Sequence, residues 1–309
     1  MYNSTKQLEE LTHLFMKILA IETSFDDCCV ALLKNGKILQ NLKVSLKNNG
    51  LIPKEGEMHH QKHLPLLLQE IKEYDAICCT RGPGQSMCLR QGWLTAIELS
   101  QKFSKPLMGI HHMEAHCLSP LIDSNVPFPY LCFIASGGHT QLVKVHSPVQ
   151  FELLSDCLDD SIGEAYDKVA RLFNTSAPEM CKLIYNNKSL ANGPSVMRSD
   201  KTGNFSFSGL KSAIKLMKSQ AKFDDFSIMS AFQKSALDHV QRQISLILRR
   251  NSNFKALTGA GGALMNSALN DLVKEIGKRN CIPVYIPKPL LDRQCCYDWL
   301  LRAFANRSK

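Results

Sequence analysis

A pattern of strand, polar turn and strand occurs twice in this chain and limits the folds that it can adopt. The first copy has apolar runs at residues 18–21 and 28–33 on either side of a polar turn. The second copy has apolar runs at residues 130–135 and 141–145 around the polar turn 136–140. Because the two copies lie about half a chain apart, they predict a duplicated architecture.

The segments around these two copies are predicted to alternate between helix and strand. Asn35-Gly36 is a hairpin signal, which adds a third strand over residues 37–42 to the first copy. Further strands are expected at 75–80, 107–110, 257–262 and 282–286, and helices at 59–74, 94–103, 162–173, 208–218, 226–249 and 265–278. Residues 174–204 are polar and contain Pro178 and Pro194, so we expect an irregular surface excursion there.

This succession predicts an α/β fold of the actin-like ATPase and sugar-kinase type, with two duplicated lobes and a cleft between them. In such a fold a nucleotide lies in the cleft, and the polar turns hold its phosphates. We place the N-terminal lobe at residues 17–125 and the C-terminal lobe at residues 126–309. The chain has 309 residues, 44% of them hydrophobic, which is ample for a substantial core.

Charge and cysteine content narrow the class of protein further. Lys and Arg number 37 against 28 Asp and Glu, and the resulting charge of +9 favours a polyanionic partner such as RNA. The 12 cysteines show no C-x-x-C spacing, which argues against a zinc ribbon or a thioredoxin-type pair. Most lie in apolar runs, so we expect small buried thiols in a reducing compartment. No apolar run approaches the ~20 residues that a membrane helix needs.

Two histidines, His112 and His116, are candidate metal ligands because they are four residues apart. If the segment after Ile110 is helical, both imidazoles lie on one face and supply half of a divalent metal site. The missing oxygen ligand is expected from Asp292, which follows the last predicted strand, although Asp298 is equally suitable chemically. The alternative is a helix with one surface and one core histidine that binds nothing.

Three glycine-containing turns follow predicted strands, at residues 81–84, 136–138 and 258–262. Glycine lets backbone N–H groups approach an anion closely, so these turns suit a nucleotide phosphate and sugar. Asp167, in the helix expected at 162–173, could accept both ribose hydroxyls or pair with Arg171. Asp159 and Asp160 are expected at a helix start from the helix dipole alone.

Taken together, the motifs resemble those of the tRNA N6-adenosine threonylcarbamoyltransferase family over about residues 17–300. The resemblance rests on Ile18-Leu-Ala-Ile-Glu-Thr-Ser24, Thr80-Arg-Gly-Pro-Gly84, His111-His-Met-Glu-Ala-His116, Ser136-Gly-Gly-His-Thr-Gln-Leu142, Leu158-Asp-Asp-Ser-Ile-Gly-Glu-Ala-Tyr-Asp-Lys168, Phe205-Ser-Phe-Ser-Gly-Leu-Lys211 and Gly261-Gly262 with Asn266. The His-His-Met-Glu-Ala-His and Ser-Gly-Gly-His-Thr forms are similar to the bacterial and mitochondrial branch.

The resemblance implies that the threonylcarbamoyl group of threonylcarbamoyl-AMP passes to N6 of the adenosine 3′ of the anticodon, in tRNAs that read ANN codons. It implies one divalent metal ion per subunit, iron or zinc with magnesium as an alternative, and a homodimer that binds tRNA and no membrane. The branch suggests a mitochondrial location, but residues 1–17 make a poor transit peptide, so the cytoplasm is the alternative. The implied metal ligands are His112, His116 and Asp292, and the implied substrate-binding residues are Ile134, Ala135, Ser136, Gly137, Gly138, Asp167 and Asn266.

Some residues depart from the family pattern. Residues 174–180 lack the family's glycine-rich loop, Arg293 follows Asp292 where the family has Asn, and the tail after the last motif is short. These departures motivate an alternative function, a degenerate member that binds nucleotide or tRNA without turnover. A zinc metalloprotease is disfavoured, because Met113 stands where H-E-x-x-H requires Glu. An actin-like sugar or acetate kinase would leave the histidine pair unexplained.

Overall fold

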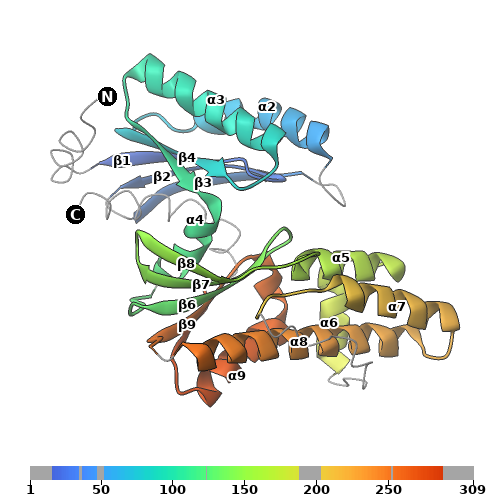
Figure 1. The fold of residues 1–309 in the computed structure, drawn as a ribbon. Coiled ribbons are helices and arrows are strands. Elements are labelled where there is room, and N and C mark those ends of the chain that lie inside the picture. Colours follow the sequence, from blue (N-terminus) through green and yellow to red (C-terminus); the bar gives the residue numbers. More distant parts are fainter. Residues whose placement is uncertain are drawn as a thin grey trace. The chain divides into compact units, whose positions relative to one another are not determined.

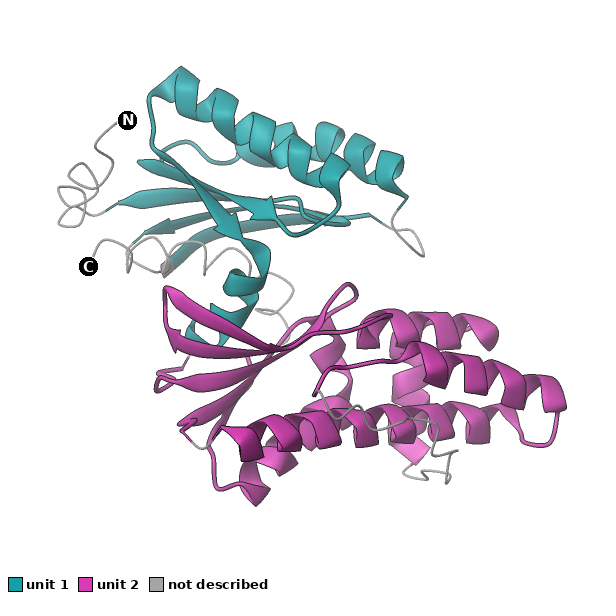
Figure 2. Ribbon diagram, viewed as in Figure 1, with its two compact units in different colours: residues 1–122, 290–309 teal, residues 123–289 magenta. Residues whose placement is uncertain are grey.

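The computed structural model of the chain describes residues 16–34, 37–46, 52–122, 124–187, 203–251 and 253–287 (Figure 1). The described residues form two compact units that divide after Ile122 (Figure 2). Asp292 and Asp298, the candidate oxygen ligands, lie outside the described residues, as does Arg293.

The first unit is a five-stranded sheet with two long helices, α2 (Pro53–Gln69) and α3 (Ser86–Phe103), on one face (Figure 1). Its strands are β1 (Lys17–Glu22), β2 (Asp27–Lys34), β3 (Lys37–Ser45), β4 (Ala76–Gly82) and β5 (Leu107–His111). The sheet order is β3-β2-β1-β4-β5, with β1, β2 and β3 antiparallel and β4 and β5 parallel to β1. The short helices α4 (His112–Leu118) and η2 (Ser119–Leu121) follow β5 directly.

The second unit repeats this sheet. Its strands are β6 (Tyr130–Ala135), β7 (Thr140–Ser147), β8 (Gln150–Ser155), β9 (Ala256–Ala260) and β10 (Val284–Tyr285). The order β8-β7-β6-β9-β10 matches that of the first unit position by position, with the same antiparallel and parallel pairings. The duplication predicted from the sequence is therefore confirmed.

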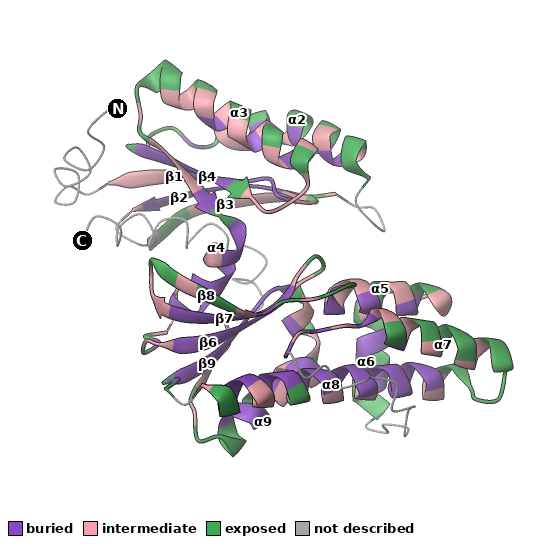
Figure 3. Cartoon of the chain, in the orientation of Figure 1, coloured by how far each residue is buried: buried purple, intermediate pink, exposed green. Residues whose placement is uncertain are grey.

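Helices account for the greater size of the second unit. They are α5 (Ile162–Leu172), α6 (Ala177–Asn187), α7 (Ser208–Gln220), α8 (Asp225–Arg250), η3 (Gly262–Met265) and α9 (Ser267–Arg279). Their apolar faces share a core with β6 and β9, whose residues are all buried (Figure 3). The side chains of β6 are covered on both faces, as expected for a strand with a parallel neighbour in the middle of a sheet.

Several elements differ from the sequence prediction. Helix α2 lies at Pro53–Gln69 where 59–74 was predicted, and α3 begins at Ser86, eight residues before the predicted start. The expected irregular excursion at 174–204 contains the helix α6, and the prediction there was wrong. Ser176 and Glu179 form a capping box: Glu179 Oε2 accepts from Ser176 N at 3.1 Å, and Glu179 N donates to Ser176 Oγ at 3.4 Å. Pro178 lies in the first turn of this helix, where the missing N–H costs nothing. The edge strand β8 was not predicted, because its sequence lacks a continuous apolar run, and half of its residues are exposed.

Burial of the cysteines agrees with the sequence prediction. Of the ten described cysteines all are free thiols, and only Cys157 and Cys281 are not buried. Burial raises the pKa of the Cys28 thiol to about 12, with a further contribution from Asp27. Such thiols stay protonated and act as small apolar side chains. Among the described residues, no helix has the length and apolar content that a membrane crossing requires.

Candidate functional site

The two candidate histidine ligands lie side by side in the first unit. Helix α4 begins at His112, immediately after β5, so His112 and His116 are one helical turn apart on the same face. Both are buried, and their ring centroids are 4.7 Å apart with an interplanar angle of 81°. The conditional prediction that this segment is helical and brings the two imidazoles together is confirmed.

Glu22 lies next to His112 and was not predicted as a site residue. It ends β1, is 4% exposed, and its Oε2 lies 3.3 Å from His112 Nδ1. Its Oε1 accepts from Ser24 N at 2.6 Å, and its Oε2 also accepts from the Thr80 hydroxyl. Burial acts to raise the pKa of Glu22, but the electrostatic interaction with His112 and the hydrogen bonds from His112, Ser24 and Thr80 lower it to about 2. Glu22 is therefore a buried carboxylate that remains ionised.

The chemistry of this pair fits a divalent cation. Two neighbouring imidazoles, one of them next to a carboxylate, are typical nitrogen ligands of zinc or ferrous iron. The described residues contain no group of three His, Cys, Asp or Glu side chains that could hold a metal ion. The described part of the chain thus supplies two ligands, and the role of Asp292 as the third stays a prediction.

The Ser136–Gly138 turn in the second unit is a candidate for phosphate binding. Ser136 N donates to His139 O at 2.9 Å and His139 N donates to Ser136 Oγ at 3.0 Å, which closes the turn. Gly137 and Gly138 are exposed, and in the described structure no hydrogen bond uses their N–H groups. Ile134 and Ala135 are fully buried in β6, at the strand end from which the turn emerges.

The N-terminus of α5 lies against this turn. Ser161 caps the helix by accepting from Glu164 N at 3.1 Å, and its hydroxyl donates to Gly137 O at 2.6 Å. A Cβ on Gly163 would lie 2.5 Å from Ser136 O, so only glycine permits this approach. The positive end of the helix dipole thus lies next to two available amides, an arrangement that favours an anion.

A second glycine turn meets the same edge of the sheet. Gly261 has a φ of 101°, and a Cβ there would lie 2.3 Å from Ala135 O, at the end of β6. Gly262 follows and has nothing within 4 Å of a Cβ position. The structure therefore brings together the predicted turns at 136–138 and 258–262.

The third predicted turn, at residues 81–84, has a packing role. A Cβ on Gly84 would lie 2.6 Å from Ser24 O, and Gln85 N donates to that same carbonyl at 2.8 Å. The glycine at position 84 is therefore required by close contact with the loop after β1. This packing role is distinct from the anion binding that was predicted from the sequence for all three turns.

Asp167 and Asn266, the other candidate substrate residues, both lie near α6. Asp167 is exposed and makes no ion pair with Arg171 in the described structure, so the alternative of a helix salt bridge is not realised. Partial desolvation raises the pKa of Asp167. The positive charge of Arg171 opposes this shift, and the negative charge of Glu164 adds to it. Asn266 caps α9 by accepting from Ala268 N at 3.0 Å, and its Nδ2 lies 3.3 Å from Cys181 Sγ.

The two acids before α5 hold a loop in place. Asp159 accepts from Phe207 N at 2.7 Å and from the hydroxyls of Ser206 and Ser208 at 2.6 and 2.7 Å. Asp160 forms ion pairs with Lys168 of α5 and Lys211 of α7. The helix begins after both residues, at Ile162, so these contacts explain the two acids better than the helix dipole does.

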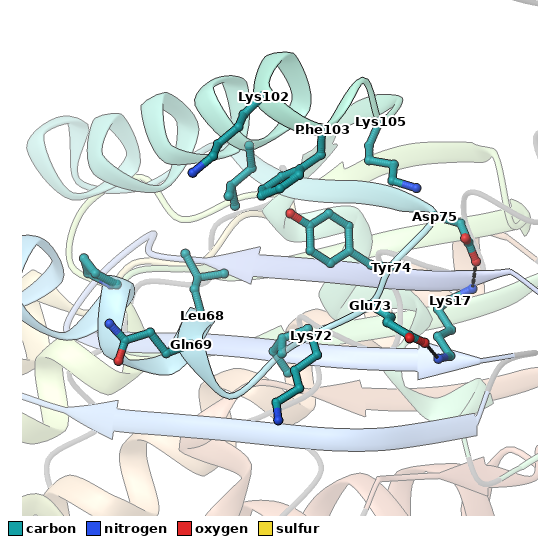
Figure 4. A pocket seen from close by; sticks show the side chains of 13 residues that line it. Lys17, Leu68, Gln69, Lys72, Glu73, Tyr74, Asp75, Lys102, Phe103 and Lys105 are labelled. Carbon is teal, nitrogen blue, oxygen red and sulfur yellow. Dashed lines mark hydrogen bonds and ion pairs between the residues drawn. The ribbon is translucent and has the colours of Figure 1, made fainter.

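A separate cavity of about 600 Å³ lies at the start of β1, between the C-terminal ends of α2 and α3 (Figure 4). Lys17 Nζ pairs there with Glu73 at 2.6 Å, and Tyr74 and Phe103 lie across from the pair. Glu22 ends the same strand, roughly 16 Å away at 3.3 Å per residue. No predicted site residue lines this cavity among those described, and we assign it no part in the site.

Comparison with known proteins identifies the family. The sequence profile of the tRNA N6-adenosine threonylcarbamoyltransferase family matches residues 36–294. A protein of that name from Mycoplasmopsis agalactiae is 33% identical over 87% of this chain and 93% of its own length. One from Thermotoga neapolitana is 34% identical over 88% of this chain and 88% of its own length. One from Staphylococcus epidermidis is 31% identical over 89% of this chain and 87% of its own length.

Solved structures share the fold at low sequence identity. Component A of the (R)-2-hydroxyglutaryl-CoA dehydratase of Acidaminococcus fermentans matches with a TM-score of 0.61 and 14% identity, over 95% of this chain and 100% of its own. HypF from T. kodakarensis matches with a TM-score of 0.65 and 11% identity, over 96% of this chain and 48% of its own. These likenesses and the duplicated sheets establish the predicted actin-like ATPase and sugar-kinase type of fold. The profile match and the relatives show that the chain belongs to the tRNA N6-adenosine threonylcarbamoyltransferase family, whose members are enzymes of tRNA modification.

Proposed function

We propose that this protein transfers the threonylcarbamoyl group of threonylcarbamoyl-AMP to N6 of the adenosine 3′ of the anticodon in tRNAs that read ANN codons. The observation that carries the proposal is the anion-binding arrangement at the end of β6, where α5 and two glycine turns meet. Transfer releases AMP, and a site that favours a phosphate anion stabilises this leaving group.

The reaction joins a weak nucleophile to an activated acyl group. The exocyclic amine attacks the carbamoyl carbon, the bond from that carbon to the phosphate oxygen breaks, and the amine loses a proton. The N–H groups of Gly137 and Gly138 would donate hydrogen bonds to the departing phosphate and stabilise the negative charge that develops on it. The segment 134–138 would cradle the adenylate. Asp167 would accept its ribose hydroxyls, and Asn266 would hold its base side.

We propose that His112 and His116, with Asp292, hold one divalent metal ion, iron or zinc with magnesium as the alternative. Such an ion supplies Lewis acidity and orients the intermediate when bound. The protein presents two imidazoles from one face of α4. Both rings are buried, and their centroids are 4.7 Å apart.

The proposed partners follow from charge and family. An excess of nine positive charges suits the phosphate backbone of tRNA, and an anticodon-loop base is already partly unstacked. We propose a homodimer, to be measured by light scattering of the purified protein. We also propose a mitochondrial location, with the cytoplasm as the alternative; the relatives named above are bacterial.

A substrate comparison tests the proposal. The purified protein is incubated with threonylcarbamoyl-AMP and one of two transcripts, an ANN-decoding tRNA or the same tRNA with guanosine 3′ of the anticodon. We expect threonylcarbamoyladenosine in the first transcript and no modification of the second. Tight binding of AMP and tRNA with no product from either would instead support the alternative, a member that binds without turnover.

A further inference from the structure

Glu22 occupies a position that the proposed reaction does not explain. Its carboxylate is buried at the end of β1 and contacts Ser24, Thr80 and His112. Thr80 belongs to β4 and His112 begins α4, so one carboxylate connects three elements of the first unit. A buried charge is costly unless its hydrogen bonds are satisfied, and Glu22 meets this condition with three donors.

We propose that Glu22 is a positioning residue that fixes the tautomer of His112, with the proton on Nδ1 and the lone pair on Nε2 available to a cation. The proposal rests on the metal site proposed above. Its geometric basis is the 3.3 Å separation between Glu22 Oε2 and His112 Nδ1. Both oxygens of this carboxylate already accept hydrogen bonds, Oε1 from Ser24 N and Oε2 from the Thr80 hydroxyl, so the imidazole nitrogen that faces Oε2 must carry a proton.

The hydroxyl of Ser24 also lies near the same nitrogen, at 3.4 Å, and could act as donor or acceptor there. If Ser24 donated to Nδ1, the neutral ring would carry its proton on Nε2 and could not offer that nitrogen to a cation. Glu22 excludes this state, because its carboxylate would then face a lone pair. The carboxylate therefore decides which of two tautomers His112 adopts.

Glu22 acts through His112 and is not itself a ligand. Its Oε1 accepts a hydrogen bond from the amide of Ser24, and its Oε2 accepts from the Thr80 hydroxyl and the His112 imidazole. Carboxylates that accept from a metal-bound histidine orient the ring and increase its basicity, and their loss commonly weakens metal binding 10- to 100-fold. We expect the same range for the replacement Glu22→Gln, which keeps the shape of the side chain and removes its charge.

The first test uses the wild-type protein without metal. The ¹⁵N chemical shifts of histidine-labelled protein report the tautomer of each imidazole, and His112→Ala identifies the signal of His112. We expect the Nδ1–H tautomer at His112. The Nε2–H tautomer would overturn the proposal, and this result does not depend on whether any variant folds.

The second test measures Zn²⁺ affinity by competition with a chromophoric chelator. We expect Glu22→Gln to raise the zinc Kd by roughly 10- to 100-fold, with a native circular dichroism spectrum. The matched control is Glu114→Gln, which removes a charge two residues after His112, from another face of α4, and should change the Kd less than about threefold. An unchanged Kd for Glu22→Gln, or an equal loss in the control, would refute the proposed role.

These measurements are independent of the transfer reaction. If the wild-type protein binds Zn²⁺ and shows the expected tautomer but transfers nothing to tRNA, the proposed function fails and the role of Glu22 stands. If transfer occurs and the tautomer is the opposite one, the role of Glu22 fails alone.

Discussion

The contact between α5 and the Ser136–Gly138 turn makes a quantitative prediction about Gly163. A Cβ at this position would lie 2.5 Å from Ser136 O, 2.8 Å from Gly137 Cα and 2.9 Å from Gly137 N. The first distance is about 0.9 Å short of the 3.4 Å at which ordinary contact begins. All three are backbone atoms, so Gly163→Ala must displace either the helix start or the turn.

Two opposing effects set the magnitude. Overpacking of this kind costs about 1–3 kcal/mol, while replacing glycine by alanine in a helix returns up to about 1 kcal/mol. We therefore expect Gly163→Ala to lower the free energy of unfolding by about 1–2 kcal/mol. Because the turn and the helix start also form the proposed phosphate site, we expect the affinity for AMP to fall at least tenfold.

The assays are urea denaturation and isothermal titration with AMP. Gly209 provides a matched control, because it is also the second residue of its helix, α7, and has nothing within 4 Å of a Cβ position. Gly209→Ala should stabilise the protein by about 0.4–1 kcal/mol and leave AMP binding unchanged. A Gly163→Ala protein that is as stable as the wild type and binds AMP equally well would refute this account of the site.

Three further predictions concern neighbouring residues. Ser161→Ala removes the cap of α5 and should lower the free energy of unfolding by about 1–2 kcal/mol, measured by urea denaturation. Asp160→Asn removes the ion pairs with Lys168 and Lys211 and should cost about 1 kcal/mol at pH 7. Burial opposes ionisation of Asp160, but the two lysines lower its pKa below 3.8, so this loss should shrink as the pH falls below that value; a loss independent of pH would contradict the assignment. Asp167→Asn should weaken AMP binding about tenfold and 2′-deoxy-AMP binding much less; equal effects would exclude contact with the ribose hydroxyls.

The sequence predicted the sheets well because their signal is local and repeated. The first strand of each unit, β1 or β6, is a short apolar run followed directly by a polar turn. The same pattern is therefore present in both halves of the sequence. Helix α6 was missed although its capping box, Ser176-Ala-Pro-Glu179, is visible in the sequence. The prolines and polar residues around it are typical of a loop, and they mask this short helix signal.

The candidate site was only partly predictable, because only some of its contacts join residues that are close in the sequence. His112 and His116 form a pair through helical periodicity alone, which a sequence displays. Glu22 reaches His112 across 90 residues, through the parallel neighbours β1, β4 and β5, and no local pattern encodes that contact. Gly163 could be recognised only once the helix and the turn were seen together.

The most direct measurement of the central claim compares the wild-type protein with His112→Ala in a reconstituted reaction. Both proteins, with native circular dichroism spectra, receive threonylcarbamoyl-AMP, Zn²⁺ or Fe²⁺, and an unmodified ANN-decoding tRNA, and the digested nucleosides are analysed by mass spectrometry. We predict threonylcarbamoyladenosine from the wild type and at least a hundredfold less from the variant. Equal yields from the two proteins, or no product from folded, metal-bound wild type, would contradict the account.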